Sequence, residues 1–538
     1  MGLNKLIKES PIASYGKAIR SAPREVIFNR QLLLSCVLYA MSAITATWDQ
    51  GSASVVPSLP GFQKHFGITS GTDAKQIRTF ITIIYPGYAV GAALSFFLND
   101  RIGRLWSFRL YTLIWTIGQL VACFSPGLAG LWAARIISGL GIGALTVTGP
   151  MAICELAPAE IRGLLTAWFN VAMGISLVSS IFCVLGVYQH IPTSKLQFQV
   201  VWFSPCIYMA LLVAASVFLC ESPRWLFMVD RHEEAAKVLV RIRGLPATHP
   251  RVQLELREIE DSIRREKELY HSDGLAGIIK ETFTVPSNLR RVQQSLVSYG
   301  LAQLSGANSI TSYFVPILSL MGLGGGPTRS MFLSGMYGLS KLFFTLIASF
   351  FFIDALGRRK SLFVGTFLQL ISDIYVGVYI KYKQESTVSG SASQGAIAFI
   401  FIHAFGYAVA CLLILPYVFG AELWPNRIRS FGGALSACFH WLFIYAFQSG
   451  LPSLLSQTDN WGAFIFFAGW CFIAMIYVYL MVPELSGLSV EEIDHLFQGP
   501  WFNAYKRSRK THVITSEQTD DLEAISHETS KAGVTTKE

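Results

Sequence analysis

The chain has 538 residues, of which 52% are hydrophobic and only 14% are charged, and its mean hydropathy is +0.45. So few charges cannot cover the surface of a soluble protein of this size, so the composition excludes that class and indicates an integral membrane protein. The formal net charge of +9 does not require a nucleic-acid partner, because the excess basic residues gather in loops, where membrane topology explains them.

Twelve apolar runs are long enough to cross a bilayer, which takes about 20 residues in a helix. They form two groups of six on either side of a charged central stretch. The first group lies at 31–49, 79–98, 106–124, 128–152, 164–188 and 199–220, and the second at 293–321, 329–353, 361–380, 395–420, 431–451 and 461–482. We therefore expect an all-α membrane protein with two six-helix halves.

Basic residues set the expected orientation. The first 30 residues are basic but contain no short apolar core with a cleavage site, so we expect no removable signal peptide. Further basic residues gather at 101–108, 224–292, 358–360 and 506–510. The positive-inside rule places these loops and both termini in the cytoplasm.

The nine cysteines lie in or at the edge of the apolar runs, without a CxxC motif. This placement is typical of small buried hydrophobic residues. We expect neither disulfides nor a metal site.

The two halves repeat the same short motifs. NDRIGRL follows the second run and IDALGRR the eighth, ELAPAEIR follows the fourth and ELWPNRIR the tenth, and ESPRWL and PELSGLS follow the sixth and twelfth. A six-helix unit has thus been duplicated in parallel, an arrangement typical of transporters that rock two halves about a central site.

Acids and arginines recur at fixed positions in these repeated motifs. Carboxylate and guanidinium groups at cytoplasmic helix ends can pair across helices and hold one conformation. Topology alone explains the arginines but not the matched acids. We predict a conformational latch made of Asp100, Arg101, Arg104, Glu155, Arg162, Glu221, Arg224, Asp354, Arg358, Glu422, Arg429 and Glu484.

The six motifs, in this order, resemble the signature set of the sugar porter family of the major facilitator superfamily. The resemblance covers nearly the whole chain, and it is specific for the family but weakly specific for the substrate. It implies the major facilitator fold with twelve transmembrane helices, alternating access, and a multi-pass protein of the plasma membrane, which we expect to be a monomer.

The resemblance also implies an intracellular helical domain in the central loop, where charges spaced four residues apart favour helices. We predict five segments: a cytoplasmic segment at 1–30, the first half at 31–221, the helical linker domain at 222–290, the second half at 291–482 and a cytoplasmic tail at 483–538. The tail is polar from about residue 511 and is expected to be disordered.

Asp49 in the first run and Arg135 in the fourth are ionisable residues in membrane spans, which are functional candidates. In proton-coupled sugar porters an aspartate in the matching motif, usually preceded by Gly-Tyr and here by Thr47 and Trp48, titrates against an arginine at the matching fourth-helix position. A carboxylate that leaves its guanidinium partner gains a proton more readily, so protonation can follow conformation. The alternative is a static ion pair.

The seventh run contains AQLSGANSITSYF, which is similar to the sugar-binding stretch of the family. Gln303 and Asn308 are kept, whereas Ala302 replaces a glutamine. An amide offers a donor and an acceptor to a sugar hydroxyl, so we predict that Gln303 and Asn308 bind substrate, with helix–helix hydrogen bonding as the alternative.

Other substrate positions depart from the family pattern. Val171 and Val178 stand where many members have glutamines, and Tyr417 stands where an aromatic, often tryptophan, packs on the sugar. Trp441 is kept in the eleventh run, with His440 beside it. We include Tyr417, His440 and Trp441 as substrate-binding candidates, although lone aromatics in a membrane helix more often pack or face lipid.

Lys341 interrupts the apolar eighth run, about one residue from a position where sugar porters commonly place a sugar-binding asparagine. It lies roughly 20 Å from the cytoplasmic motif, which is too deep for the side chain to reach water easily. It can pair with Asp373 of the ninth run, stand as a structural residue at the cavity wall, or bind an anionic substrate. We favour the third interpretation, since a substrate carboxylate would supply the missing negative charge.

We therefore expect a secondary active transporter, not an enzyme, that carries a small polyhydroxylated substrate by proton symport, with a sugar acid such as a uronate or quinate favoured. The alternatives are a symporter or facilitator of neutral mono- or disaccharides, and a non-transporting nutrient sensor of the same fold. No cofactor other than the proton is expected, and GLGIG, within an apolar helix, is a packing motif rather than a phosphate loop.

Overall fold

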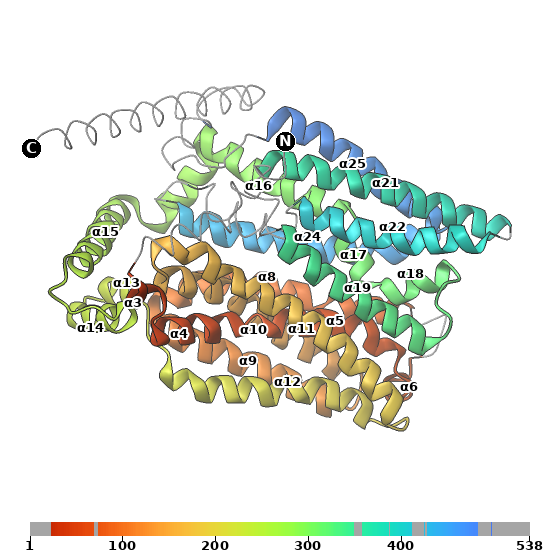
Figure 1. The fold of residues 1–538 in the computed structure, drawn as a ribbon, viewed down its shortest axis with the longest axis horizontal. Coiled ribbons are helices and arrows are strands. Elements are labelled where there is room, and N and C mark those ends of the chain that lie inside the picture. Colours follow the sequence, from red (N-terminus) through yellow and green to blue (C-terminus); the bar gives the residue numbers. More distant parts are fainter. Residues whose placement is uncertain are drawn as a thin grey trace, which may run out of the picture.

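The computed structural model describes residues 23–68, 74–348, 358–386, 388–410, 424, 428–482 and 497. Every regular element within these residues is helical, and ten helices there are long and apolar enough to cross a membrane. The helices run side by side in two bundles, and α13 to α15 lie at one end (Figure 1). The expected all-α fold is confirmed.

The first bundle contains the first six spans. Its helices are α3 (Arg24–Ile27), α4 (Arg30–Met41), α5 (Ile44–Val55), η1 (Val56–Ser58), α6 (Pro60–Phe66), α7 (Ala74–Thr82), α8 (Ile84–Ile102), α9 (Arg104–Phe124), α10 (Leu128–Leu156), η2 (Ala159–Ile161), α11 (Arg162–His190), α12 (Leu196–Ala215) and η3 (Ser216–Phe218). The first span is composite, because α4 and α5 follow each other with only two residues between them.

Glycines bring α8 and α10 into close contact. A Cβ atom at Gly139 would lie 2.5 Å from the carbonyl oxygen of Ile84, and one at Gly87 would lie 2.7 Å from that of Ile136. Small residues allow this backbone approach, as in other membrane helix pairs. The GLGIG sequence therefore serves helix packing, as its position in an apolar run predicts.

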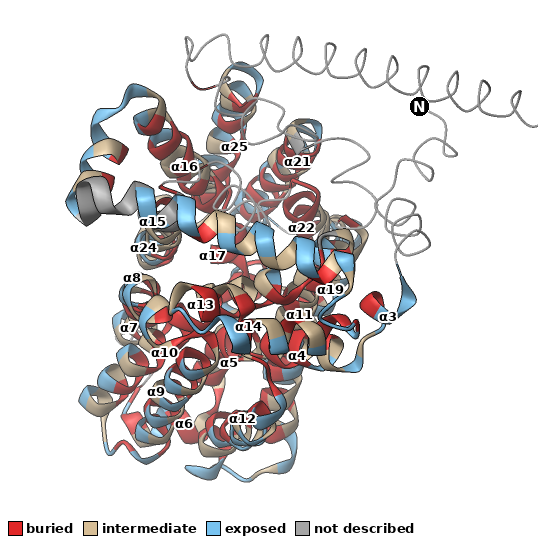
Figure 2. Ribbon diagram, turned by 90° about the vertical axis from the view of Figure 1, so that its left-hand side faces the viewer, coloured by how far each residue is buried: buried red, intermediate tan, exposed pale blue. Residues whose placement is uncertain are grey.

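The central stretch forms α13 (Pro223–Met228), α14 (His232–Arg243) and α15 (Pro250–Thr284). The hydroxyl of Ser222 accepts the Trp225 N–H at the start of α13, and Gly244 ends α14 in the left-handed conformation, a common helix stop. Viewed from this end, the two bundles lie on opposite sides and α15 runs along the boundary between them (Figure 2).

The second bundle contains α16 (Pro286–Leu304), α17 (Ala307–Ser312), α18 (Phe314–Leu320), α19 (Pro327–Ile347), α21 (Arg358–Glu385), α22 (Gly390–Val409), α24 (Arg429–Gln457) and α25 (Trp461–Met481). The seventh predicted run is therefore the second half of α16 followed by two short helices, rather than one helix. Gly306 breaks it with a φ of 78°, a conformation that glycine adopts without steric cost.

The two bundles meet along three sets of helices: α5 packs on α17 and α18, α7 and α8 pack on α24, and α11 packs on α19. Arg78 on α7 donates to the hydroxyl of Ser453 on α24 at 3.0 Å. The interface thus contains the segments in which most of the candidate substrate residues lie.

Candidate functional site

Asp49 and Arg135 form a buried ion pair in the first bundle, between α5 and α10. Arg135 also donates through Nε to the carbonyl oxygen of Phe80 at 3.0 Å, and its guanidinium carbon lies 4.5 Å from the centre of the Phe80 ring. Arginine keeps its charge at all physiological pH values. Asp49 is therefore the member of this pair that can gain and lose a proton.

The ion pair is connected to the opposite bundle through α7. Phe80, which holds Arg135, is two residues from Arg78, which bonds Ser453 on α24. Nη2 of Arg135 is buried and has no hydrogen-bond partner among the described residues. A movement of α7 relative to α24 would therefore act on the surroundings of Asp49.

Gln303 and Asn308 meet across the break at Gly306. The Asn308 amide donates to Oε1 of Gln303 at 2.9 Å, which leaves Nε2 of Gln303 buried without a partner among the described residues. A Cβ atom at Gly306 would lie 2.6 Å from the Phe467 ring. The helix break thus holds the two amide side chains together and leaves the N–H groups of Gln303 Nε2 able to donate to another group.

The ammonium group of Lys341 points to α17 and α22. It donates to Oγ1 of Thr311 at 2.9 Å, and it lies 5.2 Å and 5.9 Å from the ring centres of Tyr407 and Tyr337. The residue is 8% exposed, and no acidic side chain pairs with it within the described ranges. Thr311 is one helical turn after Asn308, so the ammonium lies roughly 5 Å further along α17 from the amide pair.

The structure places Asp373 beside His403 rather than beside Lys341. Oδ1 of Asp373 lies 3.5 Å from Nε2 of His403, and Sγ of Cys471 lies 3.9 Å from Oδ2. The first alternative for Lys341 therefore finds no support in the geometry, whereas the cavity-wall and anion-binding interpretations remain open.

Trp441 and His440 on α24 point to different partners. The Trp441 ring lies 4.6 Å from Tyr88 at 79°, and 6.3 Å from Tyr85 at 15°, both on α8 of the other bundle. The His440 ring lies 5.6 Å from Tyr299 within its own bundle. Trp441 therefore packs across the interface, and Tyr417, the third aromatic candidate, lies outside the described residues.

Several neighbours were not singled out from the sequence, namely Tyr85, Tyr88, Thr311, Tyr337 and Tyr407. All five lie in apolar runs, where an isolated tyrosine or threonine is ordinary. The pair Tyr85 and Tyr88 carried a signal, because tyrosines three residues apart share one helix face.

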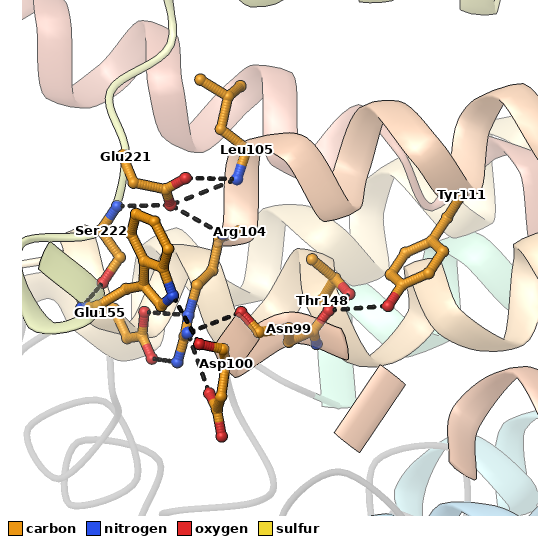
Figure 3. A network of polar contacts seen from close by, with 10 residues as sticks. Asn99, Asp100, Arg104, Leu105, Tyr111, Thr148, Glu155, Glu221 and Ser222 are labelled. Carbon is orange, nitrogen blue, oxygen red and sulfur yellow. Dashed lines mark hydrogen bonds and ion pairs between the residues drawn. The ribbon is translucent and has the colours of Figure 1, made fainter. Parts of the chain in front are cut away.

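The repeated motifs of the first half form one polar network (Figure 3). Arg104 is 3% exposed and donates to both carboxylate oxygens of Glu155, at 2.9 and 2.8 Å, and to Asp100 at 3.1 Å. Such bidentate pairs are strong and specific in geometry. Glu155 on α10 and Asp100 on α8 are thereby joined to the start of α9.

Glu221 caps the same helix. Its carboxylate accepts the backbone N–H groups of Arg104, Leu105 and Ser222 at 2.8, 3.1 and 2.9 Å. Burial raises the pKa of Glu221 above its ordinary value, and these hydrogen bonds only partly oppose the shift. A carboxylate at a helix N-terminus also suits the helix dipole.

The other latch candidates are less completely placed. Arg224 donates to the hydroxyl of Ser262 at 3.5 Å, whereas Arg101 and Arg162 are exposed and form no ion pair with another described residue. The predicted counterparts in the second half are outside the description, either entirely or in their side chains: Asp354, Arg358, Glu422, Arg429 and Glu484. Whether the latch is duplicated thus stays a prediction.

Comparisons with known proteins agree with this arrangement. A family model described as "Sugar (and other) transporter" matches residues 35–497. A probable quinate permease of Aspergillus niger is 28% identical over 490 residues, covering 89% of this chain and 90% of that protein. The quinate permease of Emericella nidulans is 27% identical over 488 residues, with coverage of 89% and 90%.

Solved structures of the same fold are also similar. The proton:xylose symporter XylE bound to 6-bromo-6-deoxy-D-glucose superposes with a TM-score of 0.70 at 21% identity, covering 87% of this chain and all (100%) of that chain. The inward open conformation of XylE from E. coli gives a TM-score of 0.68 at 20% identity, with coverage of 86% and 99%.

Proposed function

Because this chain belongs to the sugar (and other) transporter family, whose members here are permeases and not enzymes, we propose that it takes up an anionic polyhydroxylated acid together with protons. The ammonium of Lys341, with which no acidic side chain of the described residues forms an ion pair, is the observation that carries the proposal. A charge buried in a membrane protein is costly unless it is paired. One hydroxyl and two ring faces do not neutralise it, whereas a substrate carboxylate would.

The neighbouring groups suit the remainder of such a substrate. The amides of Gln303 and Asn308 and the hydroxyl of Tyr337, all buried, offer donors and acceptors for hydroxyl groups. Quinate has both a carboxylate and several hydroxyls, and the relatives named quinate permease support it as the first substrate to test. A uronate presents the same chemistry.

Asp49 is the proposed proton carrier of the first bundle. Protonation would release it from Arg135, and this change would reach the interface through Phe80 and Arg78 on α7. The transporter needs no cofactor other than the proton in this scheme, and we place it in the plasma membrane with both termini cytoplasmic.

Symport of a neutral sugar is the second candidate. The amide pair across Gly306 supports it, since amides bind neutral hydroxyls without any charge. Lys341 would then be a structural residue that the aromatic rings of Tyr337 and Tyr407 stabilise.

A competition panel separates the two candidates. The full-length protein in proteoliposomes, with an imposed inward proton gradient, is tested for uptake of labelled quinate against unlabelled quinate, galacturonate, xylose and maltose. We expect competition by the two acids and uptake that falls when the gradient is collapsed. Competition by neutral sugars alone would refute the anionic substrate, and uptake indifferent to the gradient would refute symport.

A further inference from the structure

A second buried pair of titratable groups lies in the C-terminal bundle, away from Asp49. Asp373 on α21 and His403 on α22 are each 1% exposed. Nε2 of His403 lies 3.0 Å from the carbonyl oxygen of Ser305. A carbonyl oxygen only accepts hydrogen bonds, so Nε2 carries a hydrogen, and in the neutral ring the other nitrogen, Nδ1, holds the lone pair.

Nδ1 of His403 is a vacant proton acceptor. It is buried and has no hydrogen-bond partner in the part of the chain that the structure describes. Buried polar atoms normally have a partner, so an unpaired nitrogen on a ring whose other nitrogen lies 3.5 Å from a carboxylate calls for an explanation. A proton on Nδ1 would turn His403 into a cation that compensates the charge of Asp373.

The charged and titratable groups around the pair come from several helices. Cys471 of α25 and Ser305, which follows α16, contact the pair directly, and Tyr337 of α19 is within electrostatic range of Asp373. Lys341 lies beyond Tyr337, where it contacts Thr311 and Tyr407. Tyr337 also contacts the ammonium of Lys341. Lys341 is therefore a buried cation on the far side of Tyr337 from Asp373.

A cavity lies between the immediate neighbours of the pair and the end of α25. It has a volume of about 30 Å³ and is lined by Ser305 and Cys471, which contact His403 and Asp373, and further along by Tyr477 and Val482 at the end of α25. One water molecule needs only about 15 Å³ of such space. The cavity can thus hold water on the side to which a proton would be released.

We propose that Asp373 and His403 form a second proton-binding site, which is loaded when an anionic substrate binds to Lys341. In the empty carrier, ionised Asp373 and the ammonium of Lys341 form no ion pair, but their opposite charges leave this region without net charge while His403 is neutral. The substrate carboxylate neutralises Lys341 and leaves Asp373 unbalanced, so a proton from solution binds Nδ1 of His403 and restores neutrality. Release of the substrate reverses both steps.

The helix break connects the two sites physically. His403 bonds the carbonyl of Ser305, and Gln369 on α21 donates to the Ser305 hydroxyl at 3.3 Å. Gln303 and Asn308 lie on either side of the same break. A change in the charge of His403 therefore acts on the segment that presents the substrate amides.

The inference rests on the proposed function. The number of protons taken up per quinate bound tests the inference separately from the proposed function. Quinate binding to purified full-length protein is measured by titration calorimetry at one pH in two buffers of different ionisation enthalpy, in an Asp49→Asn background that silences the first site. We expect about one proton taken up per quinate bound, and none per xylose. Adding His403→Gln or Asp373→Asn should reduce the uptake to none while quinate still binds.

The control and the outcomes are distinct. His232→Gln removes an imidazole that is about half exposed, 52%, on α14, and it should leave the count unchanged. Quinate binding without proton uptake, or uptake that persists in both His403→Gln and Asp373→Asn, would overturn the second proton site alone. If no acid binds, the proposed function and this inference both fail. Both variants are expected to abolish proton uptake. If one of them does not fold, the other still tests the inference.

Discussion

Replacement of Lys341 by methionine tests the charge preference directly. Methionine has a similar length but no charge, so the ring contacts with Tyr337 and Tyr407 are kept in part while the ammonium is lost. A hydrogen bond to a charged group contributes about 1.5–3 kcal/mol, and every 1.4 kcal/mol changes affinity about tenfold. Quinate affinity should therefore fall by about 10- to 100-fold.

Neutral substrates should respond differently to the same change. Xylose has no carboxylate, so its affinity should change by no more than about threefold, and removal of an uncompensated buried charge should not destabilise the fold. Lys341→Arg keeps the charge on a planar group with a different hydrogen-bond geometry, and it should retain part of the preference for acids.

The measurement is the ratio of inhibition constants for quinate and xylose against proton-driven uptake. Lys280→Met, an exposed position on α15, is the matched control and should leave the ratio unchanged. If the ratio in Lys341→Met equals that of the wild type, Lys341 does not discriminate between charged and neutral substrates and the proposal fails.

Three further predictions concern other parts of the molecule. Asp49→Asn should lower the number of protons carried with each quinate from two to one, measured from the reversal potential in proteoliposomes, and should keep exchange of substrate in counterflow; an unchanged proton number would contradict the role of Asp49. Arg104→Ala leaves Glu155 buried without its partner and should cost about 3–5 kcal/mol, seen as a large loss of thermal stability that Arg104→Lys partly restores. Glu221 has a raised pKa in the folded state, so its contribution to stability is present below its ordinary pKa of 4.5 and is lost as pH rises through the raised value; Glu221→Gln should therefore lose less stability than the wild type between pH 5 and pH 7.

Hydropathy and the duplicated motifs were enough to predict the helical fold, because both depend only on the order of residues along the chain. The contact between Asp49 and Arg135 was also predicted, through the family resemblance. The contact between Asp373 and His403 was not, because it depends on how α21 and α22 are rotated against each other. An amphipathic pattern reports that rotation only weakly in helices that are apolar on all sides.

Trp441 shows a second limit of prediction from sequence: the residue was recognised as a candidate, but its packing partners were not. The motif predicted a substrate contact, whereas the structure packs the ring on Tyr85 and Tyr88 across the interface. An aromatic side chain buries a large area against any complementary surface. The sequence alone does not show whether that surface belongs to a bound substrate or to a tyrosine ring. A side chain at this position can still meet substrate once the bundles separate, so its predicted role stays a prediction.

The number of protons decides how the membrane potential acts on an anion carrier. With one proton per monovalent anion, transport moves no net charge, and an inside-negative potential gives no help. With a second proton on His403, each cycle carries one net positive charge inward, which is worth about 2.3 kcal/mol per 100 mV.

Quinate should therefore produce an inward current that grows as the inside is made more negative. In His403→Gln the current should vanish while gradient-driven quinate uptake continues, because one proton per anion is electroneutral. A current of undiminished size in this variant would show that the second charge enters elsewhere. Asp49→Asn does not substitute for this test, since it removes the proton of the other bundle and leaves the one on His403, so a loss of current in that variant would not locate the second proton.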